Sequence, residues 1–483
     1  MASTATRAAR VPDSPALRGA VWPGVALACG LAVGVAASFD WVTAVVLAAA
    51  LALAPVVLFF PPLMTLLIVA TAFTQAVSVG GLTISRIIAP LALLVILVAL
   101  TRGGYVLQIG APLGWVCAYS VWALASGLWT LHFGDTVTTL WSLAIALTYM
   151  LAFAILLRSR LDLDRMLYTL AFMALVVGVI GISTSHGRAE GASGNANYFA
   201  MVEIFALPFV LVLATEVRSH LARVGLYAIV FVIIFSVFAS LSRGGFLTLI
   251  SVGVAALILP ARSTFFQSRG QKAFVLALIA ACTFIAFKAT AGSLAPRLDS
   301  IFAQGETGAG RTNLWRGAWT SIQERPVLGL GYGSFISEAN ELMLRTPGVD
   351  LTNQKLLQGG LYAHNAYIGT TAELGIPGLI FFVGILISAG RALRRTAARA
   401  AAAGAMYIMR IANASLISLI ALSIAALFAS SETSRPIWIL IGISLALPKL
   451  IDEWENARSA DVENAQLPTL SETTRVGNQY GRA

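Results

Sequence analysis

A histidine at the mouth of an apolar segment is the residue of this chain best placed to do chemistry. His364 ends a long polar segment that begins near Gly292, and Asn365 and Tyr367 follow it at the start of the next apolar run. An imidazole has an ordinary pKa of about 6.5 and accepts a proton at neutral pH. His364 is therefore a candidate general base, and Asn365 and Tyr367 are candidates to orient it or its substrate.

Arginines are expected on the same membrane face as His364. Arg311 and Arg316 lie in the polar segment, and Arg243 lies in a minimal turn between two apolar runs. A guanidinium at membrane depth is costly unless it is paired or faces a polar cavity, so Arg243 either marks a functional site or snorkels to the surface. Because the guanidinium fork makes bidentate bonds to phosphate oxygens, Arg243 and Arg311 suggest a lipid diphosphate as ligand.

Two polar residues near the start of one apolar run are further candidates to support this site. Asn197 stands in Asn195-Ala196-Asn197-Tyr198, where the run begins, and Glu203 follows about 7 Å deeper at a helical rise of roughly 1.5 Å per residue. Glu203 is interpreted as a protonated residue, a hydrogen-bonded structural residue or the counter-charge of an arginine. The sequence leaves these three interpretations open.

Two other motifs resemble functional signatures but lack the required context. Asp162-Leu163-Asp164 has the form of a metal-dependent glycosyltransferase motif, yet it falls in a charged loop on the opposite face from His364. Gly329-x-Gly331-x-Gly333 resembles a phosphate loop, but no strand precedes it and no Gly-Lys-Ser/Thr follows, so it is interpreted as a turn. We find no signature of a metal enzyme or a serine hydrolase, and we expect neither a metal nor another cofactor.

The composition is that of a polytopic membrane protein. The chain has 483 residues, of which 58% are hydrophobic and 11% charged, whereas soluble domains carry about 25% charged residues. Its mean hydropathy is +0.83. A crossing helix needs roughly 20 apolar residues. We predict an all-α bundle of about 12 to 14 spans, of which 87–100 and 245–260 are short enough to be re-entrant. The candidates are 21–38, 42–60, 63–79, 87–100, 112–130, 138–157, 166–182, 198–215, 222–241, 245–260, 273–290, 366–389, 411–429 and 436–450.

The distribution of basic residues predicts the orientation, since cytoplasmic loops retain Lys and Arg. With the N-terminus inside, fourteen basic residues fall in inner loops, and only Arg86, Arg188, Arg243 and Arg435 fall in the short outer loops and their edges. The long polar segment then faces outward and the C-terminus lies inside. The net charge of +10 is mostly a topology signal, and it gives no reason to expect a nucleic-acid partner.

These spans divide the chain into five parts. We predict a cytoplasmic segment 1–20, transmembrane helices over 21–291, a periplasmic loop domain 292–365, transmembrane helices over 366–451 and a disordered cytoplasmic tail 452–483.

The predicted loop domain contains a short helix. Leu314, Trp315, Ala318, Trp319 and Ile322 recur at helical spacing on one stripe, and the helix ends before Pro326. Such a helix can lie on the membrane face and still present Arg311 to the site.

Taken together, these motifs resemble the O-antigen ligase and O-antigen polymerase superfamily of bacterial envelopes. The resemblance covers about 195–390, and it rests on the order and spacing of pieces that are weak singly. The pieces are Gly194-Asn195-Ala196-Asn197-Tyr198, Ser242-Arg243-Gly244-Gly245, Gly310-Arg311-x-x-Leu314-Trp315, Pro326-x-Leu328-Gly329-x-Gly331-x-Gly333, Ala363-His364-Asn365-x-Tyr367 and Glu373-Leu374-Gly375-Ile376-Pro377-Gly378.

The resemblance implies a glycosyltransferase in the bacterial inner membrane. Such proteins move a glycan from undecaprenyl diphosphate to a hydroxyl acceptor at the periplasmic face, without a nucleotide sugar or a metal. The functional trio of ligases of this type, two arginines and a histidine, falls on Arg243, Arg311 and His364.

Three functions remain open from the sequence. A ligase passes the glycan to the lipid A core oligosaccharide, whereas a polymerase of O-antigen or exopolysaccharide passes it to another lipid-linked repeat unit. The third function is a polysaccharide transporter or flippase without catalysis. It predicts two related halves and charged residues at the bilayer midplane, whereas the candidates in this sequence cluster at one surface.

Overall fold

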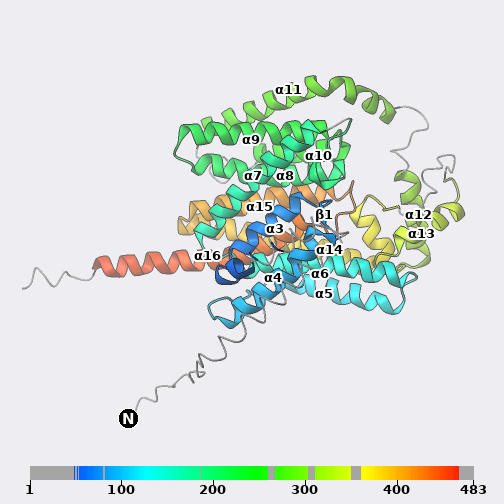
Figure 1. The fold of residues 1–483 in the computed structure, drawn as a ribbon, viewed down its shortest axis with the longest axis horizontal. Coiled ribbons are helices and arrows are strands. Elements are labelled where there is room, and N and C mark those ends of the chain that lie inside the picture. Colours follow the sequence, from blue (N-terminus) through cyan, green and yellow to red (C-terminus); the bar gives the residue numbers. More distant parts are fainter. Residues whose placement is uncertain are drawn as a thin grey trace, which may run out of the picture.

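The long apolar runs form helices because the bilayer core offers backbone groups no hydrogen-bond partner outside the helix itself. In the computed structural model, they assemble into an all-α polytopic bundle (Figure 1). The structure describes residues 48, 52, 54–79, 82–184, 187–258, 266, 268–302, 311–349 and 361–466. Within these residues, nine helices are long and apolar enough to cross a membrane. The predicted class, an integral membrane helix bundle, is confirmed.

The described elements follow the predicted spans closely. The helices up to the polar segment are α3 (Leu63–Phe73), α4 (Ile84–Thr101), α5 (Ala111–Ala125), α6 (Phe133–Leu156), α7 (Arg160–Ser183), α8 (Ala196–Glu216), α9 (His220–Ala239), α10 (Arg243–Ile258) and α11 (Arg269–Phe302). After them come α12 (Arg311–Glu324), α13 (Phe335–Arg345), α14 (Ala366–Ala403), α15 (Met406–Ala425) and α16 (Arg435–Gln466). Short 3₁₀ turns lie at Ser126–Leu128 and Gly191–Ser193, and β1 (Ser78–Val79) pairs antiparallel with β2 (Leu82–Thr83).

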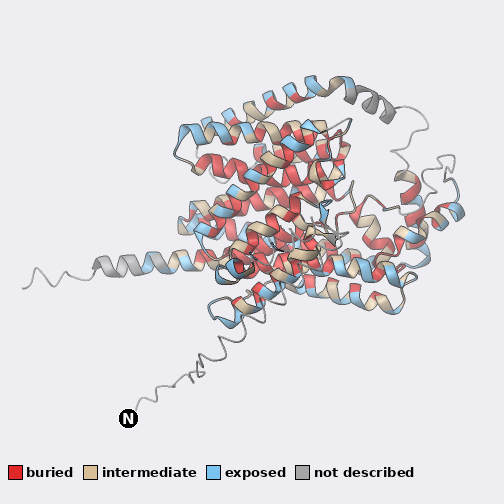
Figure 2. Ribbon diagram, in the orientation of Figure 1, coloured by how far each residue is buried: buried red, intermediate tan, exposed pale blue. Residues whose placement is uncertain are grey.

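Helix α8 runs through the middle of the bundle. It packs against α7, α9, α10 and α15, and 94% of its apolar window is buried. In contrast, only 17% of the α11 window is buried, and α11 lies along the outside against α9 (Figure 2). Elements packed around α8 are therefore held by the core, whereas α11 presents most of its surface to the surroundings.

Two of the fourteen predicted spans cannot be compared fully with the structure. Residues 21–38 lie outside the described part of the chain, and 42–60 is described only at 48, 52 and from 54 onward. Each of the other twelve coincides with a helix.

Two of the matching helices are short. The predicted span 63–79 is wrong in length, because α3 ends at Phe73 and the chain then turns into the β1–β2 pair. Eleven residues extend about 16 Å, well short of a bilayer core of about 30 Å. Helix α10 has 16 residues and is also short, whereas α4 is long enough to cross.

Two helices run past their predicted ends. Helix α11 continues from Gly292 to Phe302. Helix α16 continues to Gln466, so the first part of the predicted tail is helical, and residues 467–483 lie outside the described part. Asp452 and Glu455 of α16 form ion pairs with Arg399 of α14, which favours the helical extension.

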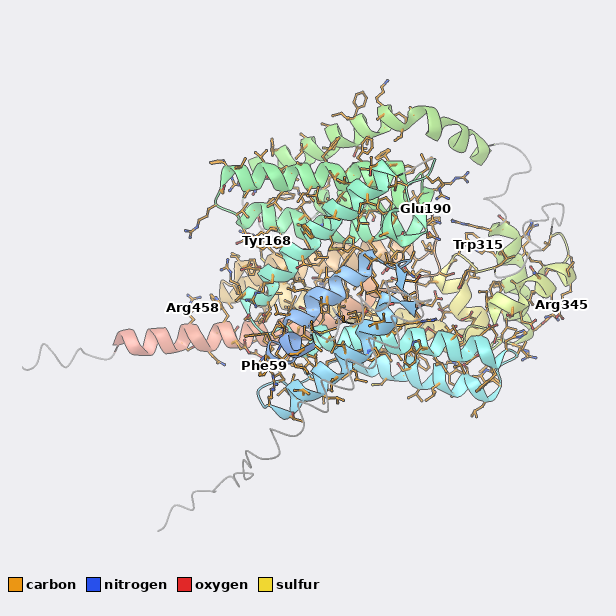
Figure 3. All side chains as sticks on the ribbon, in the orientation of Figure 1. Phe59, Tyr168, Glu190, Trp315, Arg345 and Arg458 are labelled. Carbon is orange, nitrogen blue, oxygen red and sulfur yellow. The ribbon has the colours of Figure 1, made fainter. Side chains whose placement is uncertain are left out.

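Helices α12 and α13 form a small unit at one end of the bundle, opposite the end from which α16 projects (Figure 1). Leu314, Ala318, Phe335 and Leu342 are buried between them and the start of α14. The predicted helix over 311–322 is therefore confirmed as α12, although Trp319 of its stripe is 60% exposed. Trp315 and Arg345 both lie at this end, whereas Tyr168 and Arg458 lie at the other (Figure 3).

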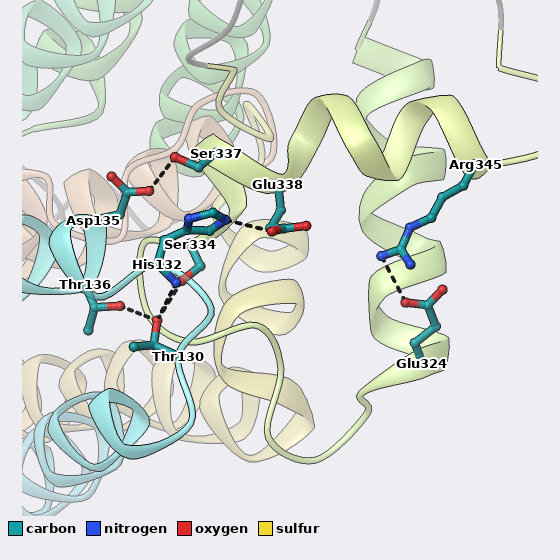
Figure 4. Close-up of polar contacts among 9 residues, drawn as sticks. All are labelled: Thr130, His132, Asp135, Thr136, Glu324, Ser334, Ser337, Glu338 and Arg345. Carbon is teal, nitrogen blue, oxygen red and sulfur yellow. Dashed lines mark hydrogen bonds and ion pairs between the residues drawn. The ribbon is translucent and has the colours of Figure 1, made fainter.

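Polar contacts attach α13 to the turn between α5 and α6 (Figure 4). His132 Nε2 lies 2.7 Å from Glu338 Oε1, and the hydroxyl of Ser337 donates to Asp135 Oδ2 at 2.5 Å. The two residues of the His132–Glu338 pair are 206 positions apart in the chain. This histidine therefore has a structural partner.

The glycine-rich segment 326–333 docks into a break in α14. Gly375 leaves the helical conformation with φ 68°, so carbonyls near it are free to accept other hydrogen bonds. The N–H groups of Leu330 and Gly331 donate to Ala372 O and Glu373 O at 3.0 and 2.9 Å. A side chain at Gly375 would run into the Val327 carbonyl. The segment is thus a packed turn, as predicted, and its glycines permit the close approach.

Candidate active site

His364 is held in an uncommon backbone conformation at the start of α14. Its φ is +50°, in the left-handed region that non-glycine residues seldom occupy. The His364 N–H donates to Ser430 Oγ at 3.1 Å, and the Ala363 carbonyl accepts from Trp315 Nε1 at 2.8 Å. Because Trp315 belongs to α12 and Ser430 follows α15, two separate elements fix this histidine.

Arg243 and Arg311 each occupy the first position of a helix. Arg243 begins α10 and Arg311 begins α12. A helix N-terminus carries partial positive charge and normally favours acidic side chains. Arg243 and Arg311 both go against this preference at the same end of the bundle. A functional role for the two arginines is therefore favoured over a structural one.

Electrostatic effects link Arg311 to both of the other candidate residues. Burial lowers the pKa of His364, and the positive charge of Arg311 lowers it further. Burial also lowers the pKa of Arg311, followed in size by the effect of Arg243. Arg243, Arg311 and His364 therefore share one neighbourhood, although they lie on three segments far apart in the sequence.

This neighbourhood is electropositive. In the described part of the chain, no carboxylate forms an ion pair with Arg311 or His364. The positive charges of Arg243 and Arg311 repel one another, and a bound anion relieves that repulsion. Arg243, Arg311 and the three helix starts can therefore hold a phosphate group.

Asn365 and Tyr367 support the position of His364 in different ways. The Asn365 side chain caps α14, since its Oδ1 accepts from the N–H groups of Tyr367 and Ile368 at 3.0 Å each. The Tyr367 hydroxyl donates to Ser423 O of α15 at 2.8 Å. Both residues fix the helix start, and the Tyr367 hydroxyl is engaged with α15.

Asn197 belongs to the surroundings of Arg243. The Ser242 hydroxyl donates to Asn197 Oδ1 at 2.8 Å, and Arg188 Nη2 lies 3.5 Å from the same oxygen. Arg188 Nε also donates to Ser240 O at 3.1 Å. Sequence reasoning counted Arg188 only as a loop charge. Its place among the few outer arginines was the one signal that could have identified it.

Two of the predicted supporting residues point elsewhere. Arg316 is exposed and bonds the carbonyl of Gly348, within the α12–α13 unit. Glu203 is fully buried next to Gly178 of α7, and neither of its carboxyl oxygens has a partner among the described residues. The interpretation of Glu203 as the counter-charge of an arginine is therefore not supported.

Comparison with known proteins agrees with the class that the fold and this site define. A family model described as O-antigen ligase matches residues 227–383, a block that contains Arg243, Arg311 and His364. This match supports the O-antigen ligase superfamily and, with it, a membrane glycosyltransferase of the ligase or polymerase type. A search of curated proteins finds no match to the chain.

Proposed function

We propose that the protein is an O-antigen ligase-type glycosyltransferase. It moves a glycan from undecaprenyl diphosphate to a hydroxyl of the lipid A core oligosaccharide. The observation that carries this proposal is the gathering of Arg243, Arg311 and His364 into one electropositive neighbourhood. The family match over 227–383 supports the same reaction class.

Arg243 and Arg311 bind the diphosphate of the donor in this mechanism. Their guanidinium groups make charge-assisted hydrogen bonds to the phosphate oxygens. Negative charge grows on the diphosphate as the bond to the sugar breaks, and the two arginines stabilise that charge in the transition state.

His364 acts as the general base. Its unprotonated ring nitrogen takes the proton of the acceptor hydroxyl while the acceptor oxygen attacks the anomeric carbon of the first sugar. The bond from that carbon to the diphosphate oxygen breaks, and undecaprenyl diphosphate leaves with the electron pair. Attack opposite the leaving group inverts the configuration. Positioned proton transfer of this kind contributes about 10²–10⁴-fold.

The reaction takes place at the periplasmic face of the inner membrane, with both termini in the cytoplasm. The excess of basic residues in the inner loops supports this orientation. Arg158, Arg160 and Arg410 line a cavity with Glu216 at the turns that precede α7 and α15, which are inner turns in this orientation. The candidate trio stands at the outer starts of its helices.

A polymerase shares this chemistry and differs only in the acceptor. Envelope glycan from a deletion strain separates the two enzymes. A ligase predicts unlinked polymer on the lipid carrier, whereas a polymerase predicts single repeat units. Single repeat units in that strain would contradict the ligase assignment.

The direct assay incubates the purified protein with a defined undecaprenyl-diphosphate glycan and each acceptor in turn. We expect transfer to the lipid A core oligosaccharide. Added chelator leaves the rate unchanged, because in this mechanism arginines neutralise the diphosphate. Strong inhibition by chelator would refute the metal-free mechanism, and transfer to none of the acceptors would favour a transporter.

A further inference from the structure

A polar cavity lies beside the segment that carries His364. It has a volume of about 210 Å³, and its lining includes Arg86, Arg435, Ser430 and Tyr198. Ser430 is the residue whose hydroxyl accepts the His364 N–H. Tyr198 follows Asn197, which contacts the Ser242-Arg243 turn. The cavity therefore adjoins the segments that carry two of the three candidate residues.

The described lining has positive charge and hydroxyl groups. It includes two arginines and six serines or threonines, and neither Asp nor Glu is among the described residues that form it. Arg435 is oriented by hydrogen bonds from Nη1 to Thr71 O at 2.5 Å and from Nη2 to Ser85 Oγ at 2.6 Å. These bonds use two of the five N–H donors of the guanidinium. Arg86 has no acidic partner within the described part of the chain.

A buried hydroxyl without a partner also marks this cavity. Ser434 lines it and is only 7% exposed, yet its Oγ has no hydrogen-bond partner in the part of the chain that the structure describes. The same holds for Ser431 Oγ in the same loop. Buried polar atoms in native proteins are nearly always paired, so these two atoms indicate that the loop is built for an additional polar group.

The size of the cavity limits what it can hold. Pockets for drug-sized ligands measure about 300–1,000 Å³, so a cavity of about 210 Å³ fits one residue of a glycan and not a whole chain. Hydroxyl groups of the lining match sugar hydroxyls, and the two arginines match a carboxylate or phosphate.

We propose that this cavity is a subsite for an acidic sugar residue, one that bears a carboxylate or phosphate, within one of the two glycan substrates. The choice of a sugar rests on the proposed function. The charge and hydroxyl content of the lining are independent of it.

The test is ligand binding by the full-length protein in detergent, measured by saturation-transfer NMR with glucuronate and with glucose as its neutral counterpart. Arg86→Gln removes one lining charge, and Ser434→Ala removes the unpartnered hydroxyl. Arg345→Gln, on the exposed face of α13, is the control. We expect glucuronate to bind in preference to glucose, and the Kd to rise about tenfold in Arg86→Gln, the equivalent of one charge-assisted hydrogen bond.

Equal binding of glucose and glucuronate, or unchanged glucuronate binding in both lining variants, overturns the proposal. Pyrophosphate that displaces glucuronate and binds more tightly assigns the cavity to the lipid diphosphate and also overturns it.

Transfer kinetics then identify the source of the acidic residue. A raised KM for the donor in Arg86→Gln assigns it to the donor glycan, and a raised KM for the acceptor assigns it to the acceptor. If the protein transfers glycan normally but glucuronate does not bind, the subsite is rejected and the proposed function stands. Glucuronate binding through Arg86 in a protein that transfers nothing would reject the transferase and leave the binding chemistry standing.

Discussion

His364 occupies a backbone conformation that costs a non-glycine residue about 1–3 kcal/mol. Leu241, just before Ser242-Arg243, is the only other non-glycine residue with positive φ in the part of the chain that the structure describes. Strained residues persist where the surroundings hold them. His364 is itself a candidate site residue, and Leu241 lies two residues before Arg243. The strain supports a functional role for the two turns.

The charge of Arg311 should set the pH dependence of the reaction. A base works above its pKa and is lost as the pH falls through it. Because burial and Arg311 lower the pKa of His364, wild-type activity should persist to below about pH 6.5. Arg311→Gln removes a positive charge, raises the pKa of His364 and moves the acidic limb of kcat/KM to higher pH. A limb that stays in place or moves to lower pH would contradict the proposed coupling.

The geometry of the guanidinium groups should matter as well as their charge. Arg311→Ala and Arg243→Ala should each lower kcat/KM for the lipid donor about 10–100-fold, the loss expected for hydrogen bonds to a charged group. Lysine at either position keeps the charge but not the fork, so its effect should be smaller. Steady-state rates with varied donor concentration measure the difference. Equal and mild losses in all four variants would point to a structural role.

The sequence singled out Arg243 for its cost at membrane depth and His364 for its reactivity, and the family resemblance grouped both with Arg311. It could not identify the role of Arg188, whose contact with Ser240 O spans 52 residues. The sequence also left the role of Glu203 open. Only the packing of α7 against α8 shows that its carboxyl oxygens have no hydrogen-bond partner among the described residues. The roles of the trio in catalysis remain a prediction.

At the level of elements, two glycine-containing motifs, segment 326–333 and Gly375-Ile376-Pro377 of α14, pack against each other. Segment 326–333 fills the break at Gly375, and the Trp122 indole donates to the Leu374 carbonyl at 2.8 Å to complete it. This contact fixes the start of α14 relative to α12. It therefore fixes His364 relative to Arg311.

Gly375→Ala should destabilise the protein. The new Cβ would meet the Val327 carbonyl, and φ 68° strains any residue with a side chain. We expect a loss of at least about 1–3 kcal/mol, seen as a lower Tm of the detergent-solubilised protein.

Gly134→Ala is the matched control, because nothing lies within 4 Å of its Cβ position. Its Tm should be unchanged or slightly higher. If both variants unfold at the same temperature, the contact at Gly375 does not stabilise the fold.

Element boundaries were the least predictable feature of the fold. Periodicity and hydropathy located the helices, but not where they end, because the ends depend on neighbours. Helix α16 extends past Ile451 alongside Arg399, and α11 passes through Gly292 without a break. The α14 break was visible only as Gly375-Ile376-Pro377. Its packing partner, segment 326–333, lies well before it in the chain.

For the molecule as a whole, composition was enough to predict the class. Apolar runs of membrane length and the scarcity of charge predicted a polytopic bundle, and the structure confirms it. The convergence of the candidate residues could not be read from composition, because it depends on how helices far apart in sequence pack.

The proposed orientation predicts which residues are accessible from the periplasmic side of the inner membrane. Glu341 on α13 and Arg394 on α14 are both exposed, and they are expected on opposite membrane faces. In a variant without Cys29, Cys117 and Cys282, Glu341→Cys should react with a membrane-impermeant maleimide in cells with a permeabilised outer membrane. Arg394→Cys should react only after the inner membrane is opened. The reverse pattern would place the site in the cytoplasm.

In the proposed mechanism, His364 takes the proton of the acceptor during glycan transfer from a lipid diphosphate. Purified wild-type protein and His364→Ala are compared in the release of undecaprenyl diphosphate with donor and acceptor present, and His132→Ala serves as a histidine control outside the trio. His364→Ala should slow release about 10²–10⁴-fold, the contribution of positioned proton transfer, while His132→Ala transfers glycan. Release by His364→Ala at the wild-type rate would show that His364 is not the general base.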